Sequence, residues 1–232
     1  MAFRPKLVPT LFTLPALIAL LALGSWQVQR LYWKGALIDK LQSRSSAAAT
    51  ELPANPEDLD ALEYKRVSAT GRFDHDNEFH LVNRSLNGNP GVHIITPLIR
   101  ADGDPALLVN RGWVPFDKKS PSQRANGQIT GLVKVEGIVR LVKGPGRFTP
   151  ENEPKKNFWF FIDPPSMARV AKLPVQPRYY VVDGNKAVPG GFPVGRQWTL
   201  KIRNDHLHYA ITWYALAIAL LVIYVLYHRR PE

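Results

Sequence analysis

The chain contains no cysteine, and its only methionines are Met1 and Met167. Without cysteine the protein has no disulfide bonds, no thiolate nucleophile and no thiolate metal site. The scarcity of methionine also excludes a methionine-rich copper site, which argues against a copper carrier. Histidine, with six copies, is left as the main ligand type for a transition metal.

Common catalytic signatures are missing as well. The sequence has no G-x-S-x-G, no H-E-x-x-H and no phosphate-binding P-loop motif. The stretch HDNEFH at 75–80 gathers two histidines, an aspartate and a glutamate. We expect a hairpin turn followed by a strand there. A zinc site is the less favoured interpretation, because good zinc sites usually need three or four converging ligands. An enzyme is therefore a minor hypothesis.

Two apolar runs are long enough to cross a membrane as helices. The later run, Tyr209–Tyr227, has 19 residues and no charge, about 28 Å of helix, which is close to the hydrocarbon thickness of a bilayer. The earlier run, Leu7–Leu23, follows basic residues, and the sequence ALG at Ala22–Gly24 would suit a small-residue cleavage site. A cleaved secretory signal is the alternative for this run. Helical periodicity continues beyond Gly24, however, which favours a retained span.

The spans divide the chain into a simple predicted order. We expect short tails at 1–6 and 228–232, transmembrane helices at 7–28 and 204–227, a helical extension and linker at 29–62, and a β domain at 63–203. Basic residues in both tails place the two ends in the cytoplasm and the central domain outside. The N-terminus lacks the arginine- and serine-rich character of a mitochondrial transit peptide. A bacterial inner membrane with a periplasmic domain is therefore predicted.

The region between the tails is basic. It keeps 26 of the 30 basic and 18 of the 19 acidic residues, a net charge of +8. Nucleic acid is not an expected partner on the outer side of a membrane. Anionic headgroups or an acidic ligand or protein surface would fit the charge, and an ordinary solvated basic surface would fit it equally well.

The region after the linker has the alternation of strands. Stretches at 64–73, 78–84, 91–99, 106–115, 128–142, 157–163, 178–183 and 197–202 are predicted strands, with short helices at 57–62 and 165–171. Seven or eight strands without alternating helices predict a mainly antiparallel barrel or sandwich. The expected fold class is an α+β membrane protein, with two transmembrane helices flanking an extracytoplasmic β domain.

The second span begins with polar residues. His206 shares one helix face with Ala210, Trp213 and Ala217, whereas His208 points roughly opposite. Asn204 and Asp205 are expected to cap the helix. His206 therefore heads a stripe of small and aromatic residues that could accept a flat apolar ligand.

A second unusual stretch is VNRGWVP at 109–115, which places Asn110, Arg111 and Trp113 at a strand end. In one interpretation Arg111 faces an anionic group of a ligand or partner. In the other, Arg111 pairs locally and Trp113 packs in the core.

Three separated motifs resemble one family. LGSWQVQRLYWK at 23–34, VNRGWVP at 109–115 and NDHLHYAITWYALA at 204–217 are similar to the Surfeit locus protein one family of cytochrome c oxidase assembly factors. GRFD, GVHIITPL and VEGIVR occur at the expected intervals between them. The resemblance covers nearly the whole chain.

The resemblance implies a non-enzymatic assembly factor for haem–copper oxidases. Its partner would be the haem-bearing subunit of cytochrome c oxidase, and the haem a synthesis machinery is a further candidate partner. Bacterial members are described as binding haem a, with a histidine at the position of His206 as candidate axial ligand of the iron. Imidazole is a normal haem ligand. The family commonly has glutamine at the position of His208, so this residue departs from the pattern.

The remaining expected site residues are candidates for binding the haem or the partner. Trp26 and Trp213 could flank the macrocycle, although anchoring at the membrane interface explains both equally well. Arg30 and Arg203 could meet the haem propionates. Asn110, Arg111 and Trp113 are the expected partner-binding residues. The alternative function is a pure interaction scaffold or chaperone that binds no haem itself.

Overall fold

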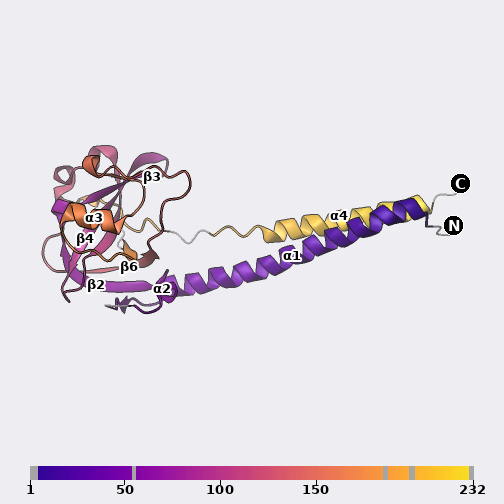
Figure 1. Cartoon of the computed structure of the whole chain (residues 1–232), viewed down its shortest axis with the longest axis horizontal. Helices are drawn as coiled ribbons and strands as arrows, with labels where there is room; N and C mark the ends of the chain where they lie inside the picture. Colours follow the sequence, from indigo (N-terminus) through magenta and orange to yellow (C-terminus); the bar gives the residue numbers. More distant parts are fainter. Residues whose placement is uncertain (1–4, 54–55, 185–187, 199–201, 230–232) are drawn as a thin grey trace. The chain divides into compact units, whose positions relative to one another are not determined.

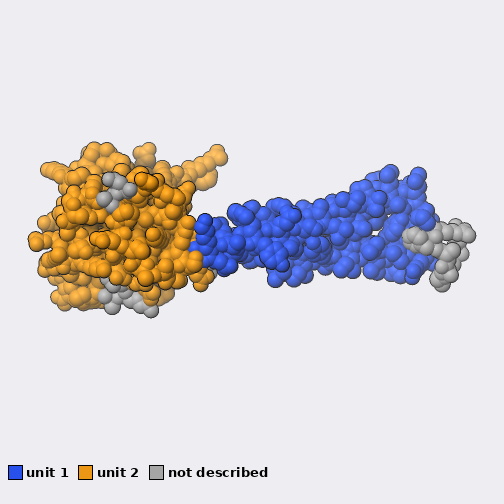
Figure 2. Space-filling view, turned by 90° about the horizontal axis from the view of Figure 1, so that it is seen from below, with its two compact units in different colours: residues 1–40, 200–232 blue, residues 41–199 orange. Residues whose placement is uncertain are grey.

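The computed structural model describes residues 5–53, 56–184, 188–198 and 202–229. The chain divides into two compact units, shown in different colours in Figure 2. The helical unit comprises Met1–Lys40 and Leu200–Glu232, and the β domain comprises Leu41–Thr199.

Two long helices form the helical unit. α1 runs from Leu7 to Ser46, and α4 runs from His206 to His228. α1 continues beyond Gly24 as predicted. Its 40 residues make about 60 Å of helix, roughly twice the thickness of a bilayer core. The part of α1 from Leu41 onward belongs to the β domain.

α1 and α4 lie side by side and antiparallel, as Figure 1 shows. The hydroxyl oxygens of Thr10 and Tyr224 are 2.6 Å apart, and those of Ser25 and Tyr214 are 3.1 Å apart. These two hydrogen bonds fix the register of one helix on the other.

Small residues allow the two helices to approach closely. A Cβ atom on Gly24 would lie 2.8 Å from the Tyr214 ring. Ala210 and Ala217 of α4 are each only 2% exposed. Small residues at such positions are typical of closely packed helix pairs in membranes.

The other faces of both helices are apolar and largely uncovered. In the most apolar 18-residue window of each helix, 6% of α1 and 11% of α4 is buried. Both helices are long and apolar enough to cross a membrane, judged by length and composition.

In the described residues the β domain has eight strands and two short helices. The strands are β1 Thr50–Glu51, β2 Arg66–Phe73, β3 Phe79–Leu86, β4 Asn89–Arg100, β5 Leu107–Pro115, β6 Val133–Leu141, β7 Phe158–Trp159 and β8 Tyr179–Asp183. The helices are α2 Leu59–Leu62 and α3 Pro164–Ala171. Short 3-10 helices lie at His75–Asn77, Phe116–Lys118, Pro121–Gly127, Pro154–Lys156 and Pro189–Gly191. α3 begins one residue before the predicted start, with prolines in its first turn as expected. The Asp163 carboxylate caps it by accepting a hydrogen bond from the Ser166 N–H.

The strands form one mixed sheet in the order β1-β2-β6-β8-β5-β4-β3-β7. An additional pairing of β2 with β4 closes β2, β6, β8, β5 and β4 into a ring, so the domain is barrel-like. The prediction of a mainly antiparallel sheet is wrong, because β1–β2, β3–β7 and β5–β8 are parallel pairs. Strand alternation identifies strands but not their partners, and a parallel pair needs only a long connection between its strands.

Several predicted boundaries also change. The segment 74–78 does not close a hairpin, since β2 and β3 both pair with β4 rather than with each other. The predicted strand at 128–142 shortens to β6, and that at 157–163 shortens to the two residues of β7. Of the strand predicted at 197–202, residues 199–201 lie outside the described residues, and Gln197 and Trp198 are not in a strand.

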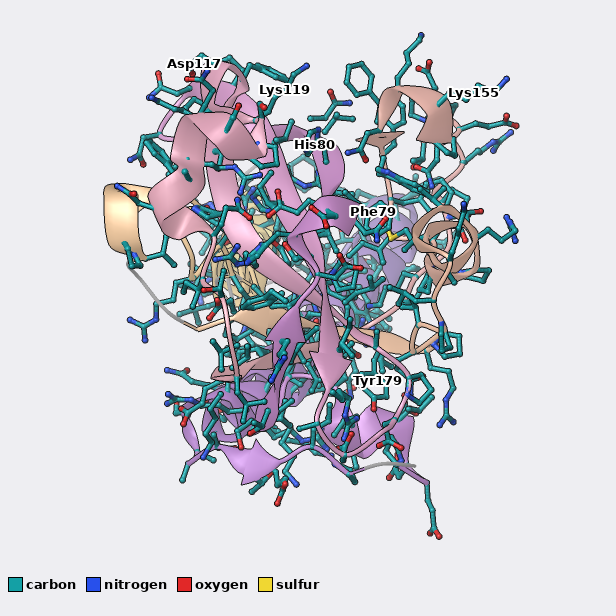
Figure 3. The ribbon with its side chains drawn as sticks, turned by 90° about the vertical axis from the view of Figure 1, so that its left-hand side faces the viewer. Phe79, His80, Asp117, Lys119, Lys155 and Tyr179 are labelled. Atoms are coloured by element: carbon teal, nitrogen blue, oxygen red, sulfur yellow. The ribbon has the colours of Figure 1, made fainter. Side chains whose placement is uncertain are left out.

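The core of the β domain comes from inward-facing strand residues. Every residue of β5 except Pro115 is buried. One cluster gathers Val67, Leu98, Val109, Val139, Val181 and Tyr179 from the ring strands. A second cluster packs Phe79 and Trp159 against Met167 of α3. The labelled side chains of Phe79 and Tyr179 lie well apart in Figure 3, one in each cluster.

Candidate functional site

The first residue of α4, His206, contacts α1 through a hydrogen bond. Its Nδ1 atom lies 2.7 Å from Oε1 of Gln27. An amide oxygen is an acceptor, so Nδ1 carries the proton and donates it. In the neutral ring Nε2 then keeps its lone pair and is available to a metal. Histidines that bind metals are held in this way, with the second ring nitrogen donating to a neighbouring acceptor.

The residues before His206 do not cap the helix with their side chains. Asp205 occupies the N-cap position but makes no side-chain capping hydrogen bond. It forms an ion pair with Arg203 instead. The Asn204 amide donates to the Leu31 carbonyl at 3.4 Å. Asp205 is thus the N-cap residue, as predicted, but without a capping hydrogen bond from its side chain, and Arg203 is already paired with a carboxylate.

The stripe below His206 is partly a packing surface. Ala210 and Ala217 are buried against α1, the other helix of the unit, whereas Trp213 is half-buried. His208 is exposed, which agrees with its predicted place on another face. The structure thus uses the small residues for helix contact and leaves His206 and Trp213 partly accessible.

The two residues expected on α1 lie beside this contact rather than in it. Trp26 is 50% exposed, and Arg30 is exposed with its guanidinium 4.4 Å from the Trp33 ring centre. Arg30 follows Gln27 by three residues and so lies one turn along the helix. The structure brings His206 to Gln27, while Trp26 and Arg30 present free surface on the neighbouring side of α1. Gln27 was not among the residues predicted from the sequence.

The residues expected to bind a partner are inside the β domain. Asn110, Arg111 and Trp113 are 5%, 1% and 6% exposed. The Asn110 amide lies 3.1 Å from Nδ1 of His93, and Arg111 donates to the Gly127 carbonyl at 2.7 Å. Burial leaves these side chains no face for a partner. The alternative interpretation is closer to the observed arrangement, because Trp113 is buried in the core. The partners of Arg111, however, are distant in the sequence rather than local.

Arg111 belongs to a buried charge cluster that the sequence did not reveal. Its Nη1 atom lies 3.8 Å from Glu78 Oε1, and Arg124 forms a close ion pair with the same carboxylate. His75 Nδ1 is 3.4 Å from Glu78 Oε1. Burial alone would raise the pKa of Glu78. Hydrogen bonds from His75 and Arg124, with the charges of both arginines, instead lower this pKa to about 2.

This cluster joins the barrel to the loop after β5. Arg124 lies in the 3-10 helix Pro121–Gly127 and also donates to the carbonyls of Lys118 and Lys119. Among the described residues, no group of three or more histidine, aspartate or glutamate side chains could hold a metal ion. HDNEFH therefore provides a structural link through His75 and Glu78.

The other histidine of HDNEFH, His80, lies close to the same loop. Figure 3 shows His80 beside Lys119. Burial lowers the pKa of His80 below its usual value. The negative charge of Glu78 opposes this shift, and the positive charges of Arg124 and Lys119 reinforce it. His80 is consequently a neutral side chain near neutral pH.

A cavity of about 380 Å³ opens elsewhere in the β domain. Arg66, Asp183, Arg196 and Trp198 line part of it. This volume is at the lower end of ligand pockets. Arg66 is paired with Glu136 at 3.0 Å, so the cavity has no strong excess of positive charge.

Comparisons with known proteins agree with the resemblance seen in the motifs. Residues 14–218 match the family model described as the SURF1 family. The chain is 38% identical to Surfeit locus protein 1 of Mus musculus, over 85% of this chain and 68% of that protein. It is 39% identical to Surfeit locus protein 1 of Homo sapiens, over 85% and 70%. It is also 39% identical to a SURF1-like protein of Monosiga brevicollis, over 90% and 83%.

These relatives correct the predicted location. They come from a mouse, a human and a choanoflagellate, and they point to a mitochondrial protein. The prediction of a bacterial inner membrane with a periplasmic domain is therefore wrong. Basic flanks indicate on which side of a membrane the chain ends lie. The choice of membrane rested instead on the lack of a transit-peptide pattern near the N-terminus, and such a lack does not identify the membrane.

Proposed function

The chain belongs to the SURF1 family, and on that premise we propose that it is a membrane-anchored factor for the assembly of haem–copper cytochrome c oxidase. In this proposal it performs no catalysis. It holds haem a as cargo through His206 and acts on the haem-bearing subunit of the oxidase.

Membrane anchoring is supported by the helical unit. The 19 residues from Tyr209 to Tyr227 carry no charge, and the apolar faces of both helices are largely uncovered by protein. Uncovered apolar surface of this extent is stable in lipid and costly in water. The hydrogen bonds between α1 and α4 satisfy hydroxyl groups that would otherwise face hydrocarbon.

The single observation that carries the haem proposal is the contact of His206 with Gln27 at 2.7 Å. It orients the ring and leaves the Nε2 lone pair for the iron of the cargo. Trp213 and Trp26 offer apolar surface for the macrocycle, and Arg30 offers a cation for a propionate. Bound haem a would supply its iron and its apolar tail, which is compatible with helices that favour lipid.

A scaffold that binds no haem is the second candidate function. Burial of Ala210 and Ala217 favours it, because helix packing accounts for these small residues without any ligand. In that case His206 would only fix the two helices through Gln27. The two functions predict different haem content and the same loss of oxidase when the protein is absent.

An absorption spectrum separates the two candidates. The full chain should be purified in detergent from cells that make haem a, together with His206→Ala and the matched control His208→Ala. We expect haem a in the wild type and in His208→Ala, and at least a tenfold loss in His206→Ala. Circular dichroism should show all three folded. A wild type without haem a, or equal haem in both variants, would remove the ligand assignment and favour the scaffold.

A further inference from the structure

One aromatic side chain projects from the loop between β6 and β7. Phe148 is 91% exposed. Among the described residues of the β domain, the next most exposed large apolar side chain is Leu132 at 62%. The loop spans residues 142–157, and loops of this length in compact domains often carry function.

The tip of this loop is an ordered turn. The Thr149 N–H donates to the Gly146 carbonyl at 3.0 Å, and the Gly146 N–H donates to the Thr149 hydroxyl at 3.0 Å. Pro145 and Pro150 flank the turn and restrict its backbone further. Phe148 is therefore held outward by a fixed backbone, so docking it would cost little conformational entropy.

A cation accompanies the aromatic ring. The Arg147 guanidinium lies 5.8 Å from the centre of the Phe148 ring, and no ion pair among the described residues includes it. Two of the three lysines in the loop are already paired. Lys143 lies 3.4 Å from Glu63, and Lys156 lies 2.6 Å from Glu153. Arg147 is thus available to a partner, beside the aromatic ring of Phe148.

From this turn we infer that residues 146–149, with Phe148 and Arg147, form a docking surface for a protein partner. The partner has an apolar pocket for the Phe148 ring and a carboxylate at the rim for Arg147. Aromatic and arginine side chains are the residues that most often dominate binding energy at protein interfaces. The identity of the partner rests on the proposed function, which makes it the haem-bearing subunit of the oxidase.

A rigid turn fits a protein pocket better than a lipid surface. A fluid bilayer accepts an apolar side chain in many orientations, so a fixed backbone brings no advantage there. The turn also presents a single apolar side chain, whereas membrane-binding surfaces gain affinity from a larger apolar area. A pocket of fixed shape benefits from the order that two hydrogen bonds and two prolines provide.

Substitutions test the surface in the full chain. Phe148→Ala and Arg147→Glu should be compared with Phe116→Ala, a matched control whose aromatic ring is 48% exposed elsewhere in the domain. The measurement is the affinity of the tagged chain for the haem-bearing subunit in detergent. We expect about a tenfold or greater loss for Phe148→Ala, as for other interfacial anchors. We expect a smaller, salt-dependent loss for Arg147→Glu and no loss for Phe116→Ala.

Photo-crosslinking identifies what covers the turn. With p-benzoylphenylalanine at position 148 of the full chain in its own membrane, the inference predicts an adduct with the haem-bearing subunit. An adduct with lipid only, or with a second copy of this chain, would overturn it. Undiminished binding by Phe148→Ala while the wild type binds the subunit would overturn the inference alone. A wild type that does not bind the subunit would overturn the proposed function as well.

Discussion

The imidazole of His206 and the side-chain amide of Gln27 are joined across two helices at 2.7 Å, although 179 residues separate them in the chain. The contact makes α1 a participant in a site that the sequence placed on α4. Gln27 therefore becomes a positioning residue for His206.

We predict that Gln27→Ala lowers the affinity for haem a by about 10- to 100-fold, the range for loss of an outer-shell partner of a metal ligand. Gln27→Glu keeps an acceptor for Nδ1–H and should retain more haem than Gln27→Ala. Haem titration followed by absorption spectroscopy measures both effects. Equal affinities for the two variants and the wild type would show that the contact does not orient the ligand.

Close packing of α1 and α4 at Gly24 should also be needed for the contact between Gln27 and His206. A valine there would press on the Tyr214 ring, because a Cβ already approaches it to 2.8 Å. We expect Gly24→Val to separate the helices, weaken the Gln27–His206 contact and reduce haem content severalfold. Gly35→Val is the matched control on the same helix, since nothing lies within 4 Å of a Cβ at Gly35. If both variants lose haem equally, valine itself and not helix contact is responsible.

Glu78 should be important for the stability of the β domain. Glu78→Gln leaves the buried positive charges of Arg124 and Arg111 without their carboxylate, which costs about 3–5 kcal/mol in comparable buried pairs. Glu136→Gln is the control, because its pair with Arg66 is 41–42% exposed and should contribute less than about 1 kcal/mol. Denaturant unfolding followed by tryptophan fluorescence gives both values.

The lowered pKa of Glu78 also makes the stability of the β domain depend on pH. This pKa falls from 4.5 to about 2 in the folded protein, so the ionised carboxylate stabilises the fold above pH 4.5. That contribution is lost as the pH falls towards 2. Comparable unfolding free energies for the Glu78 and Glu136 variants would argue against the central place of this carboxylate.

The lowered pKa of His93 predicts a second loss of stability on acidification, which begins at a higher pH than the loss due to Glu78. Burial, with a further contribution from the Arg84 charge, lowers the pKa of His93 from 6.5 to about 4. Between these values the unfolded chain binds more protons than the folded one. Stability is therefore full above pH 6.5 and decreases as the pH falls to 4.

A His93→Gln variant should remove much of this slope, because glutamine keeps a polar side chain beside Asn110 but does not titrate. Thermal unfolding of the wild type and the variant from pH 7 to pH 4.5 measures the difference, and this range lies above the Glu78 window. The lowered pKa of His80 adds a residual slope of the same sign. Parallel curves for the two proteins would assign the pH dependence to other groups.

The sequence predicted those features that depend on neighbouring residues. An uncharged apolar run predicts a long helix, and α4 follows from it directly. Short apolar runs at 91–99 and 106–115 identify β4 and β5, and proline in the first turn marks the start of α3. In each case the residues that determine the element lie within it or next to it.

Features that depend on distant residues were missed. Glu78 and Arg124 are 46 residues apart, and no local pattern shows that they meet. Arg111 looked like a binding residue because a charge at a strand end is unusual. Only the positions of Glu78 and Gly127 show that it is paired inside the domain. Gln27 was overlooked for the same reason, since its partner lies on the other helix.

The arrangement of strands also protects the protein against aggregation. The two outermost strands of the sheet, β1 and β7, have only two residues each. Along the rest of β3 the pairing with β4 is irregular between Leu81 and Arg84. An unpaired strand must be long and flat to recruit another chain. Copies of the chain at high local concentration would thus find little exposed backbone through which to join their sheets.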